Sequence, residues 1–194
     1  MISRFFDDPP GGPTLIPKTE GTAPIRSTAE QFFEAFRARV AAGLLTGRPH
    51  PRSNYVVTDA STAHLEVCAS GWWTAINVGL NRLKLRLLRP GLIRYEVQYW
   101  RWARYVLGLC SVPGLVGLAL LLSVDVRGYI ARHPSSMIPG MSIEQNLSVA
   151  WLLVLFWGFV WPWLVILLHK RSLRRLIARL IAEVDAGAAP TARS

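Results

Sequence analysis

The hydrophobic positions of this chain gather in two long, uninterrupted stretches in its second half. Residues 105–124 and 147–168 run for 20 and 22 residues without a single Asp, Glu, Lys, Arg or His. A helix rises about 1.5 Å per residue, so each stretch reaches across the roughly 30 Å hydrocarbon core of a bilayer. Both stretches also contain Pro and Gly, which membrane helices tolerate. We therefore expect a two-helix transmembrane hairpin over residues 105–168.

A helical pattern precedes these stretches in the first quarter of the chain. Ser27 followed by Glu30 is typical of a capping box, in which each side chain bonds the other residue's free backbone N–H. Apolar side chains then recur at helical spacing up to Leu44, with charged residues between them. This pattern predicts an amphipathic helix over residues 27–45. Its apolar members are Phe32, Phe33, Phe36, Val40 and Leu44.

Strand-like patterns follow this helix. Residues 55–58 and 64–68 are short β-prone runs separated by a turn-like segment. Alternating apolar residues continue over 76–87, but the phase slips at 81–82, which predicts a β-bulge in one long strand. Residues 93–99 alternate again after a turn. One helix on a roughly four-stranded antiparallel meander is an α+β fold.

The chain thus divides into four predicted regions. Residues 1–26 form a Pro/Gly-rich extension that cannot bury enough apolar surface to fold alone. Residues 27–104 form the α+β domain, and residues 105–168 form the transmembrane hairpin. Residues 169–194 contain a basic amphipathic helix and a tail. We expect the apolar side of this helix to lie on a membrane surface or a partner, with packing under the domain as the alternative.

The positive charges are distributed unevenly around the two apolar stretches. The net charge is +10, with seven Lys or Arg between residues 82 and 104 and five between 170 and 179, but only two in the loop 125–146. This asymmetry follows the positive-inside rule and predicts a multi-pass protein of the cell inner membrane with both termini cytoplasmic. Anionic lipids of the inner leaflet attract such charges by about 1 kcal/mol each. We therefore assign the basicity to membrane lipids and not to nucleic acid.

Several residues are candidates for lipid or partner contacts. Tryptophans at the entry to the first span suit the headgroup zone, and the tryptophan-rich second span suits docking by another membrane subunit. Small residues in the first span permit close helix approach, either within the hairpin or with a partner. The candidates are Trp100, Trp102, Gly114, Trp157, Trp161, Arg171, Arg174, Arg175 and Arg179.

No pattern in the sequence indicates catalysis, a metal site or a cofactor. Nucleotide-binding loops, zinc-protease helices and nucleophile elbows are absent, and no two histidines have ligand spacing. His169 lies beside a tryptophan-rich span, where haem or pigment ligation is the alternative to an ordinary interface position. The spans carry no ionisable residue, which disfavours transport. We therefore expect a non-enzymatic protein without cofactor or metal.

Two functional hypotheses follow from the apolar stretches and from the lack of a catalytic motif. The first is a non-catalytic accessory or scaffolding subunit of a larger integral membrane protein complex. The alternative is a membrane-anchored sensor whose domain binds lipid or a small ligand in an apolar pocket. The residues proposed to line that pocket are Phe32, Phe36, Trp72, Trp73 and Tyr95.

Overall fold

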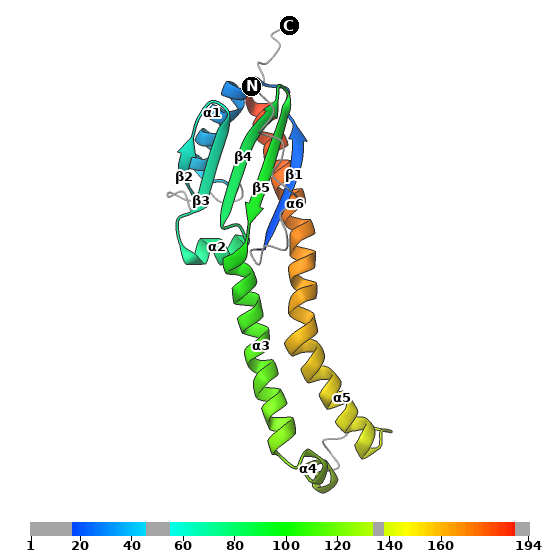
Figure 1. The fold of residues 1–194 in the computed structure, drawn as a ribbon. Helices are drawn as coiled ribbons and strands as arrows, with labels where there is room; N and C mark the ends of the chain where they lie inside the picture. Colours follow the sequence, from blue (N-terminus) through cyan, green and yellow to red (C-terminus); the bar gives the residue numbers. More distant parts are fainter. Residues whose placement is uncertain (1–16, 46–54, 134–137, 189–194) are drawn as a thin grey trace, which may run out of the picture. The chain divides into compact units, whose positions relative to one another are not determined.

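The computed structural model describes residues 17–45, 55–133 and 138–188. These residues form two compact units (Figure 1). The sheet unit contains the described residues up to Trp102 and those from Leu173 onward. The hairpin unit contains the described residues from Ala103 to Ser172.

The sheet unit is built on a five-stranded antiparallel sheet. The strand order is β1-β5-β4-β3-β2, so the last four strands of the sequence follow one another across the sheet and the first strand joins at the far edge. The predicted antiparallel sheet is confirmed, with one strand more than expected. The strands are β1 (Lys18–Pro24), β2 (Tyr55–Ala60), β3 (His64–Ala69), β4 (Arg82–Arg89) and β5 (Leu92–Gln98).

The additional strand, β1, comes from the end of the predicted Pro/Gly-rich extension, whose residues 1–16 lie outside the described residues. It pairs with β5 over its whole length, from Lys18 opposite Gln98 to Pro24 opposite Leu92. Tyr95 lies directly across from Gly21, and a Cβ at Gly21 would overlap the hydroxyl end of the Tyr95 ring. A side chain at this position would therefore require the tyrosine ring to shift. The sheet thus begins before the predicted domain boundary at residue 27, because β1 is held by backbone pairing with β5 and carries little apolar periodicity.

Helix α1 (Ala29–Ala42) starts one residue later than its predicted capping box. Thr28 is the N-cap and Gln31 completes the box, in place of the predicted Ser27 and Glu30. The apolar face is as predicted, with Phe32, Phe33, Phe36 and Val40 buried. The phenylalanine rings contact one another with centroids 5.6 and 5.7 Å apart. The hydroxyl of Ser27 is engaged elsewhere, as described below.

The predicted β-bulge is wrong, because a short helix lies where the first half of that strand was expected. Helix α2 (Trp72–Val78) buries Ala75 and Ile76 and ends at Gly79, whose φ of 71° is left-handed. A left-handed glycine after the last helical turn is a common helix stop. Ile76 and Val78 therefore lie in the last turn of this helix, Leu80 follows its glycine stop, and β4 begins only at Arg82.

The predicted basic C-terminal helix is the continuation of α6 (Trp161–Ala188). Its apolar residues Leu173, Ile177 and Ile181 are fully buried in the sheet unit. Within this unit, α1 and the C-terminal part of α6 lie on the same side of the sheet (Figure 1). The membrane-surface placement that we expected is therefore wrong, and the alternative, packing under the domain, is correct. Burial in the chain's own core removes the apolar stripe that a lipid surface would need.

The hairpin unit contains two helices that are long and apolar enough to cross a membrane. The first is α3 (Trp100–Ser123), and the short α4 (Val126–Arg132) follows it. The second is continuous through α5 (Ile143–Leu155), the π-helical segment η2 (Phe156–Val160) and α6. Their large side chains are mostly exposed, as in Leu122 at 70%. Such surfaces are typical of helices that face lipid or another protein.

Candidate functional site

The glycine predicted to serve a close helix contact is used inside the hairpin itself. A Cβ on Gly114 would lie 2.5 Å from the Gly158 Cα, and a Cβ on Gly158 would lie 2.6 Å from the Gly114 Cα. One turn along, a Cβ on Gly117 would lie 3.0 Å from Val154. The two backbones therefore touch at a pair of glycines, which small residues in membrane helices permit. Gly114 meets its own chain at this crossing.

The π-helical segment at this crossing presents an aromatic cluster of Phe156, Trp157 and Trp161. The Trp157 and Trp161 centroids are 4.8 Å apart, and Phe156 lies 5.7 and 6.1 Å from them. The backbone N–H of Trp161 donates to the carbonyl of Phe156, five residues earlier in the chain. Pro162 follows without an N–H, so the regular helical ladder is interrupted here. Trp157 remains 51% exposed.

The tryptophans at the start of α3 and the arginines of α6 have different settings. Trp100 and Trp102 are half-buried in the sheet unit, and the Trp102 ring packs edge-on against Tyr99 at 6.5 Å. Arg174 donates through Nε and Nη2 to the Glu20 carbonyl, at 3.2 and 2.8 Å. The structure thus ties Arg174 to the edge strand β1. The other predicted arginines are exposed; they are Arg171, Arg175 and Arg179.

A buried carboxylate near the end of α6 receives hydrogen bonds from the start of the described chain. Asp185 Oδ1 accepts from the Ser27 hydroxyl at 2.6 Å and the Ser27 N–H at 2.9 Å, and both Asp185 oxygens accept from the Arg26 N–H. Burial raises the pKa of Asp185, but these hydrogen bonds outweigh it and hold the pKa below its usual value. Sequence reasoning missed this contact because its partners are 158 residues apart.

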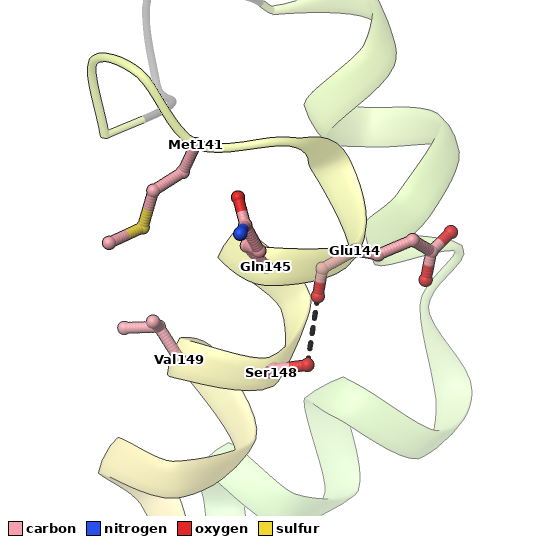
Figure 2. Close-up of a pocket in the computed structure, with 5 residues that line it drawn as sticks. All are labelled: Met141, Glu144, Gln145, Ser148 and Val149. Atoms are coloured by element: carbon pink, nitrogen blue, oxygen red, sulfur yellow. Dashed lines mark hydrogen bonds between the residues drawn. The ribbon is translucent and has the colours of Figure 1, made fainter.

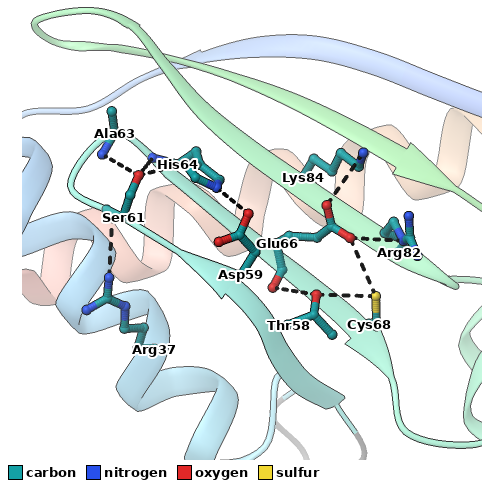
Figure 3. Close-up of polar contacts among 10 residues, drawn as sticks. All are labelled: Arg37, Thr58, Asp59, Ser61, Ala63, His64, Glu66, Cys68, Arg82 and Lys84. Atoms are coloured by element: carbon teal, nitrogen blue, oxygen red, sulfur yellow. Dashed lines mark hydrogen bonds and ion pairs between the residues drawn. The ribbon is translucent and has the colours of Figure 1, made fainter.

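A chain of three polar side chains lies at the turn between β2 and β3 (Figure 3). Ser61 Oγ is 2.6 Å from His64 Nδ1, and His64 Nε2 is 2.7 Å from Asp59 Oδ2. The hydrogen bond from His64 lowers the pKa of the Asp59 carboxyl. The same residue types occur in catalytic triads, although these three residues match no catalytic motif.

The setting of this trio favours a role in the turn. Ser61 Oγ also accepts the N–H groups of Ala63 and His64, at 3.2 and 3.1 Å, so its lone pairs already close the turn. The Asp59 side chain is exposed, at 61%. Triad chemistry needs a serine oxygen free to reach a substrate, with donors placed to stabilise the developing oxyanion. The Ser61 oxygen is engaged in hydrogen bonds within the hairpin.

A second polar group occupies the open face of the sheet beside this turn. Glu66 on β3 pairs with Arg82 Nε at 3.1 Å and Lys84 Nζ at 3.5 Å, both on β4 (Figure 3). Such exposed pairs contribute about 0–1 kcal/mol each. Among residues 17–45, 55–133 and 138–188, no group of three His, Cys, Asp or Glu could hold a metal ion.

The five side chains predicted to line a ligand pocket do not converge. Phe32 and Phe36 are fully buried and Tyr95 is 5% exposed, whereas Trp72 and Trp73 are 48% and 70% exposed. The former three belong to a packed core and the tryptophans face outward.

A surface depression of about 340 Å³ lies instead at the start of α5 (Figure 2). It is shallow and open, and one of its polar groups, the Ser148 hydroxyl, already donates to the Glu144 carbonyl at 2.9 Å. Its lining residues are Met141, Glu144, Gln145, Ser148 and Val149.

Comparison of the chain with protein-family models, with curated proteins and with solved structures finds no match.

Proposed function

We propose that this chain is a non-catalytic accessory or scaffolding subunit of a larger integral membrane protein complex. In this proposal it is a multi-pass protein of the cell inner membrane with both termini in the cytoplasm. The observation that carries the proposal is the exposed aromatic cluster of Phe156, Trp157 and Trp161 in the middle of the second apolar stretch.

The depth of this cluster supports a protein partner. Tryptophan prefers the headgroup region, where its ring is in apolar surroundings and its N–H reaches water or lipid oxygen. Trp157 lies near the centre of residues 147–168, a stretch without any charged residue. The close crossing of Gly114 and Gly158 turns the neighbouring positions outward. A large, half-exposed aromatic surface at this depth is well suited to packing against another membrane helix.

The charge distribution supports the orientation. The twelve Lys or Arg that flank the two apolar stretches on the proposed cytoplasmic side exceed the two in the loop 125–146. Positive charge retained on the cytoplasmic side is the usual determinant of topology. A reporter that is active only outside the cytoplasm should be inactive when fused after Ser194. Activity there would contradict the proposed orientation.

The complex is tested by purification of the full chain in a mild detergent that preserves membrane assemblies. We expect a particle larger than one 21.6 kDa chain in its micelle, with a co-purifying membrane protein in fixed ratio. Substituting Trp157→Leu and Trp161→Leu together should release that partner. Trp163→Leu is the matched control, because Trp163 is 58% exposed on the same helix but lies outside the cluster. A lone monomer, or equal loss in the control, would contradict the proposal.

A further inference from the structure

The short helix α2 exposes two adjacent tryptophans. Trp72 and Trp73 are 48% and 70% exposed, and Trp73 is the most exposed tryptophan of the residues that the structure describes. In the same helix, Ala75 and Ile76 are buried in the core. The helix carries no charged residue over Trp72–Val78. Large exposed aromatic pairs of this kind usually mark a contact with a membrane or a partner.

Contacts within the sheet unit hold α2 beside the first turn of α3. The Arg101 guanidinium carbon lies 6.0 Å from the Trp72 ring centroid and 5.3 Å from the Trp100 ring centroid. The Arg101 N–H also donates to Asn81 Oδ1 at 3.2 Å, just after α2 ends. Trp72 is therefore close in space to the residues that lead directly into the first candidate span.

We propose that α2 is a third membrane contact, which inserts Trp72 and Trp73 into the headgroup region of the bilayer that α3 crosses. This inference rests on the proposed membrane location of the chain. The occupant is the lipid surface, for two reasons. Tryptophan rings prefer this depth, and Arg101 between two of them supplies a positive charge for lipid phosphate. The contact is also continuous with the membrane entry of α3.

The consequence is that α2 adds a third membrane contact to the two helices, α3 and α6, that continue from the sheet unit into the apolar stretches. This additional contact restricts tilting of the sheet unit at the bilayer surface. The open polar face of the sheet, with Glu66, Arg82 and Lys84, would then be presented in a defined direction.

The test places a fluorescent probe on α2 of the full chain. Asn77→Cys puts an environment-sensitive label on an exposed position one turn after Trp73, in a background with Cys68→Ser and Cys110→Ser. The protein is reconstituted in vesicles of phosphatidylcholine with a quarter phosphatidylglycerol, and nitroxide lipids are the quenchers. Leu88→Cys is the matched control, because it is 44% exposed at the opposite end of the β4–β5 hairpin. Leu115→Cys, in the middle of α3, reports membrane insertion itself.

We expect the label at Asn77 to be blue-shifted and quenched several-fold more by headgroup nitroxides than the label at Leu88. The label at Leu115 should be quenched by nitroxides deep in the acyl chains. Replacing Trp72 and Trp73 by Ala should reduce the quenching at Asn77 to the Leu88 level and leave Leu115 unchanged.

The possible failures are distinguishable. If Leu115 is quenched but Asn77 behaves like Leu88, the α2 contact is wrong and the membrane location stands. A blue shift at Asn77 without quenching by lipid would indicate a protein contact and would also overturn the proposal. An unquenched label at Leu115 would refute the membrane location on which the inference depends.

Discussion

Two segments of the same helix, α6, show how the two units differ. Ile177 is fully buried in the sheet unit, whereas Leu167, ten residues earlier in the hairpin unit, is 61% exposed. Both are large aliphatic residues on one continuous helix, so hydrophobicity alone does not separate them. The difference is what covers them: the chain's own sheet covers Ile177, and the hairpin leaves Leu167 for lipid or another protein. Exposed apolar surface in the hairpin unit is therefore the basis for the proposed contacts with lipid or another protein.

Truncating Ile177 and Leu167 separately tests whether the two segments of α6 differ in packing. Ile177→Ala should destabilise the sheet unit by about 2–5 kcal/mol, because it leaves a cavity in a packed core. Leu167→Ala should change stability by about 0.5 kcal/mol or less, because its side chain has few neighbours of the same chain. Chemical denaturation in detergent, followed by circular dichroism, measures both. Equal losses would mean that Leu167 is packed as tightly as Ile177.

The hairpin has its own tightly packed point, which a second pair of substitutions isolates. Gly114→Ala should destabilise the hairpin by about 1–3 kcal/mol, because its Cβ would overlap the Gly158 backbone. Gly108→Ala is the control on the same helix, where nothing lies within 4 Å. That control should be neutral or stabilising by about 0.5–1 kcal/mol, because alanine favours helix. Unfolding in detergent mixtures compares them, and similar losses at both sites would rule out a specific crossing.

The smallest effect concerns pH, and it should appear in one unit only. The pKa of Asp185 is lowered in the folded state, so its contribution is present above the unfolded pKa of about 3.9 and is lost as pH falls through the lower folded value. Asp185→Asn should cost about 1 kcal/mol at neutral pH, because a neutral acceptor replaces a charged one.

This cost should shrink as the pH falls below about 3.9, because the unfolded carboxyl binds a proton there while the folded carboxylate stays ionised down to its own lower pKa. Amide exchange at Ser27, whose N–H donates to Asp185, reports the sheet unit at each pH. The spans, which carry no ionisable Asp, Glu, Lys, Arg or His over 105–124 and 147–168, should show no matching change. A cost that is independent of pH would indicate a purely steric effect.

The sequence predicted those elements whose own side chains carry a period. The apolar face of α1 is correct because Phe32, Phe36 and Val40 repeat at helical spacing. The hairpin of β4 and β5 is correct because Leu83, Leu85 and Val97 alternate with polar residues and are buried. Helix α2 was missed because Ile76, Val78 and Leu80 alternate as in a strand, although the helix ends at Val78 and Leu80 lies beyond it. Only the left-handed Gly79 and tertiary packing decide between the two structures.

For the candidate contact residues, the sequence identified the residues themselves but not the groups that they contact. The aromatic residues of the second span could be selected from composition, and the arginines after it could be selected from charge. The contact of Gly114 with Gly158 could not be predicted from the sequence, because a glycine indicates a close approach without identifying the neighbour. Arg174 likewise reads as a free cation, yet it binds the carbonyl of Glu20 on a strand 154 residues away.

Two segments long and apolar enough to span a membrane are identifiable without the structure, because length and the absence of charge are local properties. The basic flanks and the apolar stripe of the C-terminal helix are identifiable in the same way. The burial of this stripe in the protein's own core and the pairing of residues 18–24 with the sheet are evident from the tertiary structure alone. The same holds for the hydrogen bonds that Asp185 accepts from Arg26 and Ser27. These contacts join distant segments through backbone groups and single side chains, which leave no periodic pattern in the sequence.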